Sequence, residues 1–417
     1  MPRRASASAA AMPPMPPPMM RTSGRVLALT GRDSTSRPRL AAGGRATMIV
    51  MRYEHDSASF AWKASSFESP ADYLVELTGD DRGEMLAAVE ALERSGRLSP
   101  VHALTKSDFR FDGLRKKLEH GYAAVRSGKG FVVLRGLPLD GLSLEQFTAC
   151  AWGVGTHFGR ALSQNAQGEL VTSVVDATAE DATPRMYRSN LELRPHSDIT
   201  AMISLACWHK SASGGASIIV SGVTVHDEIR SRVPQLLDPL YRGYHYHRLG
   251  EEGPGEEPAT PYRTPVFANR NGQLSCRYQR SGIAAGQRER GVPLDERDLE
   301  ALNLFDEIAA APENRLAFFL ERGDMIVINN YTVMHARTRF TNFPEPERQR
   351  RLVRLWFDAE DFRDVPPEFK LFAENGIPKQ EGRRATFDFK KLYSDDTVAT
   401  GGVPDLKVSD GEAAQSR

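Results

Sequence analysis

Beyond residue 160 the chain is built from short apolar segments of five to eight residues, separated by glycine, proline and asparagine. Apolar segments of this length between turn residues are typical of strands rather than helices. Several short strands of this kind can bury their apolar faces as a sandwich or a barrel. The strands expected are 170–175, 201–208, 216–221, 243–249, 273–278 and 325–329, with one helix at 296–311.

Upstream of these segments the apolar period changes from strand-like to helical. Residues 82–95 place Met85, Val89 and Leu92 at steps of four and three, which predicts an amphipathic helix. Helices are expected in the same way at 111–126 and 143–152, with a buried strand at 130–136 between them. The predicted fold class is therefore α+β with a mainly β core (160–358), preceded by a helical part (80–155).

The first 47 residues differ from the rest of the chain. They are rich in proline, alanine and arginine and contain no acidic residue before Asp33, so they are expected to be disordered. An organelle transit peptide is the alternative, although its amphipathic helix would be broken by the prolines. If translation naturally starts at Met48 or Met51, that would also explain why the composition changes at this point. The expected domain runs from 51 to 376, followed by a tail at 377–417.

Composition excludes several classes of function. The 54 basic and 54 acidic side chains cancel, so no net field attracts the chain to nucleic acid or to an anionic membrane. Three cysteines at wide spacings indicate neither disulfides nor a zinc site, and no apolar run approaches the roughly 20 residues of a membrane span. We expect a cytoplasmic protein whose partner is a small molecule, with self-association left open.

The segment from Pro195 to Thr200 contains a His-x-Asp pair, His196 and Asp198. On an extended chain, residues i and i+2 point to the same face, so the imidazole and the carboxylate could bind one cation together. Taken alone, the pair could equally be a hydrogen-bonded contact at the end of a strand.

A third candidate ligand, His335, follows the predicted buried strand at 325–329 and a polar corner. Two histidines and one carboxylate form the facial triad that leaves open positions on Fe(II) for a cosubstrate and dioxygen. The three residues His196, Asp198 and His335 are therefore candidate metal ligands.

A basic cluster comes next in the chain, at 348–354. Arg350 and Arg354 are four residues apart, so on a strand both face the same side, whereas Arg351 shares the opposite face with Val353. A 2-oxo dicarboxylate that chelates the metal leaves its second carboxylate free, and a planar bidentate cation suits that group. Arg348 and Arg351 are expected in solvent.

The order of these motifs, together with Gly214-Gly215-Ala216-Ser217, resembles the Fe(II)/2-oxoglutarate-dependent dioxygenases of the taurine-dioxygenase (TauD/TfdA) type, including the clavaminate-synthase-like branch. The resemblance extends from about Phe60 to Gly376. It implies a double-stranded β-helix, or jelly roll, with flanking helices. It also implies Fe(II), 2-oxoglutarate and dioxygen as cofactor and cosubstrates, and oxidation, most simply hydroxylation, of an unactivated C–H bond with release of succinate and CO2.

Carried onto this sequence, the resemblance makes His196, Asp198 and His335 the iron ligands and pairs Arg350 with the distal carboxylate of 2-oxoglutarate. Ser217 occupies the place of a threonine that touches the cosubstrate in the family, and Arg354 matches an arginine near the cosubstrate or an anionic substrate. These assignments are expectations from the family.

Other candidates are weaker. Asn190 and Glu192 precede the His-x-Asp pair closely enough to be substrate contacts, and Gln164 could line the pocket. His245 and His247 are expected in structural or surface positions. The alternative to an enzyme is a jelly-roll binding protein whose metal site is structural or lost.

Overall fold

The computed structural model describes residues 53–179, 185–372 and 376–382 of the 417-residue chain. All of them belong to one unit, Gly43–Arg417. The segment 1–47 expected to be disordered, and most of the tail expected at 377–417, lie outside the described residues.

The larger of two main sheets has seven strands in the order β1-β2-β12-β6-β15-β3, with β4 also paired to β15. Its pairs are antiparallel except for β1 with β2. The strand β2 comes from the mainly helical N-terminal part and lies directly beside β12. The strands are β1 (Leu74–Glu76), β2 (Phe131–Arg135), β3 (Arg160–Ala161), β4 (Val171–Val174), β6 (Met202–His209), β12 (Met325–Asn329) and β15 (Arg351–Asp358).

The smaller main sheet has the order β11-β8-β13-β5 and is antiparallel throughout. Two short antiparallel pairs, β9 with β10 and β7 with β14, complete the strands of the described residues. The bounds are β5 (Leu193–His196), β7 (Ser213–Gly214), β8 (Ser217–Ser221), β9 (Phe267–Arg270), β10 (Gln273–Cys276), β11 (Arg315–Phe318), β13 (Val333–Arg337) and β14 (Phe340–Thr341).

The two main sheets pack on each other through one apolar cluster, and a second cluster covers the outer face of the large sheet. Strand β15 shows the division, because Leu352 and Trp356 belong to the first cluster while Val353, Leu355 and Phe357 belong to the second. This is the period-two alternation of a strand buried on both faces. The predicted mixed fold with a jelly-roll core is thereby confirmed.

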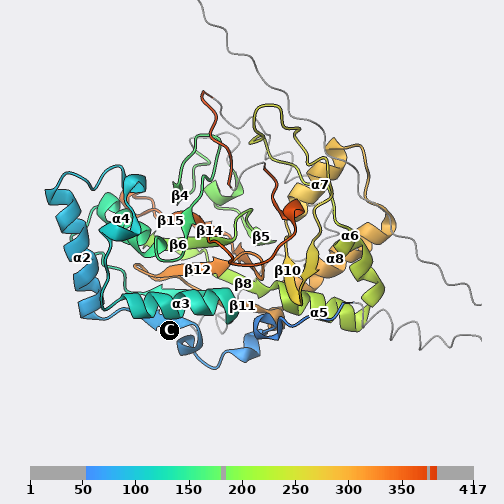
Figure 1. Ribbon diagram of the computed structural model, residues 1–417, viewed down its shortest axis with the longest axis horizontal. Helices are drawn as coiled ribbons and strands as arrows, with labels where there is room; N and C mark the ends of the chain where they lie inside the picture. The colour runs from blue at the N-terminus through green and yellow to red at the C-terminus, as the bar shows by residue number, and fades with distance from the viewer. Residues whose placement is uncertain (1–52, 180–184, 373–375, 383–417) are drawn as a thin grey trace, which may run out of the picture. The chain divides into compact units, whose positions relative to one another are not determined.

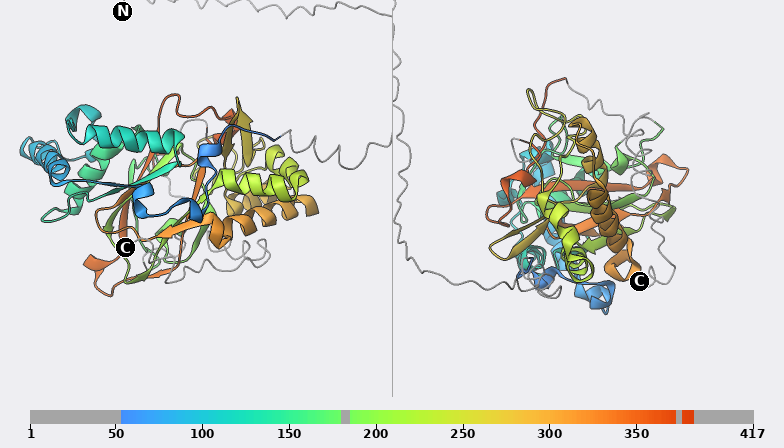
Figure 2. Two further views of the ribbon diagram at one scale, coloured as in Figure 1. Left: turned by 90° about the horizontal axis from the view of Figure 1, so that it is seen from below. Right: turned by 90° about the vertical axis from the view of Figure 1, so that its right-hand side faces the viewer.

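Helices cover the sheets from two sides. Figure 1 shows α2 and α4 at one end of the sheets and α5 to α8 at the other. Figure 2 shows α5 and α8 side by side, in agreement with their contacts. The helix α2 begins where the Thr78 side chain accepts a hydrogen bond from the Asp81 amide. The bounds are α2 (Gly79–Arg94), α3 (Arg115–Ser127), α4 (Leu144–Gly155), α5 (Gly222–Arg232), α6 (Leu237–Arg242), α7 (Arg280–Glu289) and α8 (Glu296–Ala310).

The strand expected at 243–249 is wrong. The segment buries Tyr244 and Tyr246, but its backbone forms only isolated bridges, from Tyr244 to Thr264 and from His247 to Ala259. It also bonds to a helix rather than to a neighbouring strand, since the His247 amide donates to the carbonyl of Gly282 in α7.

The expectation of a single helix in this part of the chain is wrong as well, because α5, α6 and α7 were not expected. In α5 the β-branched residues Val223, Thr224 and Val225 favour a strand locally, yet the Ser221 side chain caps the helix and α8 packs against it. Tertiary contact therefore overrides local propensity in this helix.

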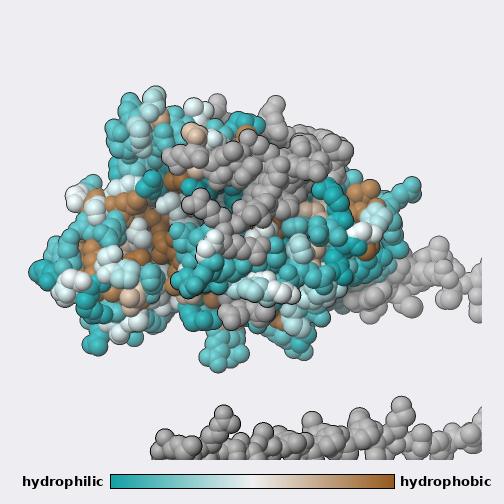
Figure 3. All heavy atoms as spheres, turned by 90° about the horizontal axis from the view of Figure 1, so that it is seen from above, coloured by the Kyte–Doolittle hydropathy of each residue, from teal (hydrophilic) through white to brown (hydrophobic). Residues whose placement is uncertain are grey.

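Hydrophilic residues cover most of the coloured surface in the view of Figure 3, with a smaller apolar area among them. Of the described residues, Leu191 is the one large apolar side chain that is markedly exposed, at 37%. Within the described part of the chain no helix is long and apolar enough to cross a membrane.

Candidate active site

Strand pairing brings His196 and His335 together across 139 positions of sequence. The two are direct register partners between β5 and β13, and their ring centroids lie 4.3 Å apart. Asp198 follows β5, and its Oδ1 lies 3.6 Å from Nε2 of His196. One ligand atom from each of the three residues lies within 4.8 Å of the others, a spacing that one metal ion could bridge.

The ring nitrogens of the two histidines differ in their hydrogen bonds, and both arrangements suit a metal ligand. Nδ1 of His196 lies 2.8 Å from the Arg194 carbonyl, which fixes the ring through that nitrogen and leaves Nε2 facing Asp198. Nδ1 of His335 is buried and has no hydrogen-bond partner among the described residues. A buried ring nitrogen without a hydrogen bond, on a histidine of this cluster, fits an Fe(II) site, because such a nitrogen is otherwise costly.

The electrostatics of the three residues also suit metal ligation. Burial alone would raise the pKa of the Asp198 carboxyl, but the charges of His335, Arg354 and His196 and a hydrogen bond from Trp356 bring it below its ordinary value. Burial and the neighbouring His196 lower the pKa of His335 to about 3. At neutral pH the site therefore offers a carboxylate and a neutral imidazole, the forms that bind metals.

A cavity of about 110 Å³ adjoins these residues. Its wall is rich in arginine, and two of the arginines have acidic partners, since Arg185 pairs with Glu251 and Arg248 lies 3.8 Å from Glu256. The cavity is lined by Arg185, Tyr187, Leu193, His196, Ser197, Asp198, Ile199, His247, Arg248, Leu249, Gln279, Arg354, Trp356, Leu371, Phe372 and Ile377.

Arg354 is a cavity residue whose guanidinium is held from several sides. Its Nε donates to Gln164 Oε1 at 2.7 Å and to Thr172 Oγ1 at 3.2 Å, and its plane lies 4.0 Å from the centre of the Tyr187 ring. Nη1 is 3.8 Å from Asp198 Oδ2, while Nη2 is buried without a hydrogen-bond partner among the described residues. Gln164, a weak candidate from sequence, thus fixes Arg354 and does not itself line the cavity.

Arg350 lies in a second buried group rather than on this cavity wall. Arg350 and Arg337 are 5% exposed each, and both guanidinium groups approach the Phe340 ring, at 5.0 Å and 4.7 Å. Ser217 is the cross-strand partner of Arg337, and Gly215 approaches Arg350 so closely that a Cβ there would lie 3.4 Å from its Nε.

The two arginines of this group form no ion pair with a carboxylate within the part of the chain that the structure describes, although the charge of Asp176 acts on Arg337. Nη1 of Arg350 and Nε of Arg337 are buried without hydrogen bonds there. Burial lowers the pKa of Arg350 to about 10, and burial with the charge of Arg350 lowers that of Arg337 to about 9. Paired guanidiniums in a buried position favour an anion.

Asn190 and Glu192 are not brought to the cavity, as neither occurs among its described lining residues. The Asn190 carbonyl instead accepts a hydrogen bond from the Phe340 amide at 3.1 Å. Sequence reasoning missed Arg337, although it lies two residues after His335 in β13 and so shares its face. It also missed Tyr187 and Gln279, which lie outside strands and follow no period that would mark them.

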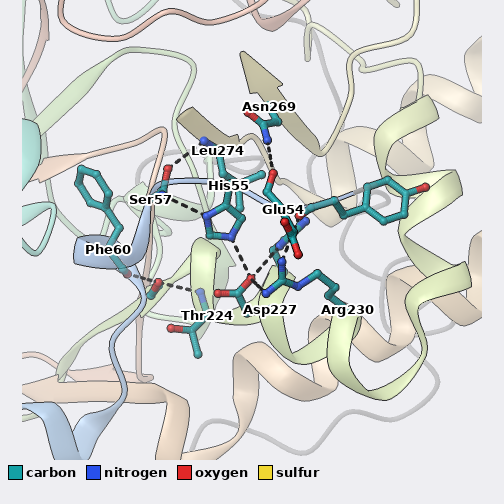
Figure 4. A network of polar contacts seen from close by, with 12 residues as sticks. Glu54, His55, Ser57, Phe60, Thr224, Asp227, Arg230, Asn269 and Leu274 are labelled. Carbon is teal, nitrogen blue, oxygen red and sulfur yellow. Dashed lines mark hydrogen bonds and ion pairs between the residues drawn. The ribbon is translucent and has the colours of Figure 1, made fainter. Parts of the chain in front are cut away.

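A second group of two histidines and one aspartate, the His55 cluster (His55, His226 and Asp227), has ligand atoms equally close together. Figure 4 shows His55 between the Ser57 amide and the Asp227 carboxylate. Nδ1 of His55 accepts the Ser57 amide proton, so Nε2 carries a proton and donates it to Asp227 at 2.9 Å.

The other contacts of the His55 cluster also oppose a metal. His226 uses both ring nitrogens, toward Asp227 and toward the Tyr241 hydroxyl, and Arg230 lies 3.7 Å from the same carboxylate. The cluster is therefore a hydrogen-bonded contact between the N-terminal segment and α5.

A jelly roll with two histidines on neighbouring strands and one carboxylate just after a strand, beside a cavity, defines the class of mononuclear non-haem iron oxygenases. The family model for taurine catabolism dioxygenases, the TauD/TfdA family, matches residues 98–356. The chain belongs to this family, and it is an oxygenase that uses Fe(II), 2-oxoglutarate and dioxygen.

Two relatives support the family. FR-33289 synthase from Streptomyces rubellomurinus is 31% identical over 311 residues, which cover 73% of this chain and 91% of that protein. The taurine hydroxylase-like protein SAT17 from Stachybotrys chartarum is 27% identical over 322 residues, covering 74% of this chain and 81% of that protein.

Solved structures share the fold. An asparagine oxygenase in complex with Fe(II), 2S,3S-3-hydroxyasparagine and succinate has a TM-score of 0.54 and 18% identity, covering 68% of this chain and 93% of that one. The non-heme iron oxygenase OrfP, in complex with Fe and alpha-ketoglutaric acid, has a TM-score of 0.52 and 14% identity over 69% of this chain and 94% of that one.

Proposed function

We propose that this oxygenase hydroxylates an unactivated C–H bond of a small anionic molecule. Substrate, 2-oxoglutarate and dioxygen would give hydroxylated substrate, succinate and CO2, with one oxygen atom in the new hydroxyl and the other in succinate. The observation that carries the proposal is the His196–Asp198–His335 cluster, in which His335 is buried and in which His196 and Asp198 line a cavity that Arg354 also lines.

Three side chains would hold the iron: His196 and His335 as neutral imidazoles and Asp198 as a carboxylate. Bound there, Fe(II) would supply the redox chemistry that dioxygen and 2-oxoglutarate require. The Asp198 charge favours a divalent cation, and the third side chain, His335, is buried.

The arginine pair would bind the distal carboxylate of 2-oxoglutarate. His335 and Arg337 lie two residues apart on one face of β13, a separation of about 7 Å along a strand. A cosubstrate anchored near His335 could therefore extend along this face to Arg337 and Arg350. The Ser217 hydroxyl, across from Arg337, keeps the hydrogen-bonding capacity that the family has at this place.

The substrate would bind in the cavity with its anionic group on Arg354. The unpartnered Nη2 of Arg354 is the donor available for it, because Gln164 and Thr172 already use Nε. Gln279 and Tyr187 add neutral polar groups to the same wall.

The experiment that tests the function has two arms. Anaerobic Fe(II) and 2-oxoglutarate, added to metal-free protein, should produce a weak visible charge-transfer band, whereas a jelly-roll binding protein with a lost metal site would produce none. Amino acids, betaines, sulfonates, phosphonates and aryloxy acids are then screened for substrate-dependent succinate formation. Neutral amides of any active acid should be poor substrates, and equal turnover of acid and amide would reject the anionic substrate.

A further inference from the structure

The two oxygens of Asp198 have different surroundings. Oδ1 is the atom near the histidines, at 3.6 Å from Nε2 of His196. Oδ2 accepts a hydrogen bond from the indole Nε1 of Trp356 at 2.8 Å and lies 3.8 Å from Nη1 of Arg354. One oxygen of the carboxylate is thus left for a metal, and the other is used by the protein.

Trp356 is fixed in position by its strand. It is 4% exposed, its backbone is in register with Ile203 of β6, and its carbonyl accepts a hydrogen bond from the Leu162 amide at 2.9 Å. The ring also lies 5.1 Å from the Arg354 guanidinium, which limits its rotation further. A donor held in this way determines where Oδ2 can lie.

The type of donor matters as well as its position. An indole has one N–H and no lone pair for a metal, so Trp356 can bind Oδ2 without competing for the ion. Two further contacts hold the backbone of Asp198. Its amide donates to Asn330 Oδ1 at 3.3 Å, and its carbonyl accepts a hydrogen bond from Arg277 at 3.2 Å. The carboxylate is therefore prevented from turning both oxygens toward the histidines.

We infer that Trp356 is a positioning residue that restricts Asp198 to binding the metal through Oδ1 alone. This inference rests on the proposed metal site. A carboxylate that binds through one oxygen leaves open the coordination position that its second oxygen would otherwise take, and both the cosubstrate and dioxygen need open positions. Loss of the indole N–H should release Oδ2 to compete with 2-oxoglutarate for the metal.

The test uses Co(II) as the probe in the full metal-free chain, followed by titration with 2-oxoglutarate. Trp356→Phe keeps an aromatic ring but removes the N–H, and it should change the Co(II) visible spectrum and raise the Kd for 2-oxoglutarate by about tenfold. Trp152→Phe is the matched control, because the Trp152 indole is also buried and donates at 3.0 Å to a carbonyl outside the site, that of Leu104. The control should stay within about twofold of wild type.

The outcomes separate this inference from the proposed function. If wild-type protein binds no Co(II), the metal site and the inference both fail. If wild type binds Co(II) and 2-oxoglutarate and Trp356→Phe gives the same spectrum and Kd, only the inference fails. Should Trp356→Phe not fold, a benzothienylalanine at position 356 keeps the bicyclic shape without the N–H, and the same two readouts decide the question.

Discussion

The role of a single side chain in this protein depends on which of its polar atoms are already used. The His55 cluster and the His196–Asp198–His335 cluster contain the same residue types at similar spacing. In the first, each histidine donates or accepts through both ring nitrogens. In the second, Nδ1 of His335 is buried without a hydrogen bond among the described residues, and Trp356 bonds to Oδ2 of Asp198. A buried ligand atom without a hydrogen bond, rather than composition, is the reason why we propose the metal site in the second cluster.

Replacing any one of the three proposed ligands by alanine should abolish activity and reduce bound iron, while leaving the fold nearly intact. The reason is that a single buried site contributes little to a core formed by two sheets. Metal analysis and succinate formation measure the effect for His196→Ala, Asp198→Ala and His335→Ala. The exposed His120→Ala on α3 is the control, and turnover like that of wild type in any of the three would remove that residue from the site.

The two neighbouring arginines should differ in their effect on 2-oxoglutarate. Arg350 is 5% exposed, whereas Arg351 is only partly buried at the start of β15. Arg350→Ala removes a desolvated bidentate partner and should raise the 2-oxoglutarate requirement by about 30-fold or more. Steady-state kinetics should show little change in the 2-oxoglutarate requirement for the control, Arg351→Ala. A large effect of Arg351→Ala with a small effect of Arg350→Ala would mean that Arg351, and not Arg350, binds the cosubstrate.

At the level of elements, helix α5 joins the N-terminal segment to the core. The His55 cluster binds residues 55–57 to the helix, and Ser221 and Thr224 at its start donate to the carbonyls of Phe60 and Trp62. This explains how a segment with little regular structure of its own is held. The energy comes from buried hydrogen bonds to charged and backbone groups.

Acid should weaken this connection. Burial lowers the pKa of His226 from 6.5, and hydrogen bonds from both histidines, outweighing burial, hold the pKa of Asp227 well below its ordinary 3.8. Both groups bind protons more readily in the unfolded chain. The free energy of unfolding should therefore fall as pH drops below about 6.5 and fall further below about 4.

The measurement is chemical denaturation from pH 7 to pH 3. Asp227→Asn should lose about 1–3 kcal/mol at neutral pH and show a shallower decline below about pH 4, where protonation of the Asp227 carboxyl no longer contributes. The exposed Asp112→Asn is the control and should follow wild type. A decline in Asp227→Asn as steep as in wild type would show that other groups cause the acid sensitivity.

For the whole molecule, the arrangement of the sheets decides where the site lies. The large sheet supplies Arg354 and Trp356 from β15, and the small sheet supplies His196 and His335 from β5 and β13. The site therefore forms only when both sheets pack around their shared apolar cluster. Residues Leu371, Phe372 and Ile377, from beyond the last strand, complete the cavity wall.

Residues 1–47 should be dispensable, because their composition provides little that could pack. A chain that begins at Met48 should match the full chain in melting temperature and rate. A chain that begins at Ala61 is the contrasting variant, since it also loses Tyr53 and His55, which are bonded to Asp238 and Asp227, and should melt several degrees lower. A several-degree loss already at Met48 would show that the first segment packs on the domain.

By itself, the sequence determined the features that local periodicity encodes. The strand alternation predicted that Arg354 lies on the face opposite to Val353, and the two-residue step from His196 to Asp198 predicted that both could face one ion. Helices α2, α3 and α4 were predicted from the apolar pattern of the sequence. These patterns survive folding because each depends on neighbours within one element.

Only the tertiary structure decided which distant residues meet. The pairing of β13 with β5 placed His335 opposite His196, and that register depends on packing across the whole sheet. The same packing turned β-branched residues into α5 and left 243–249 without a partner strand. It also brought Arg337 beside Arg350 around Phe340, because side chains far apart in sequence interact only once long-range burial has fixed the backbone between them.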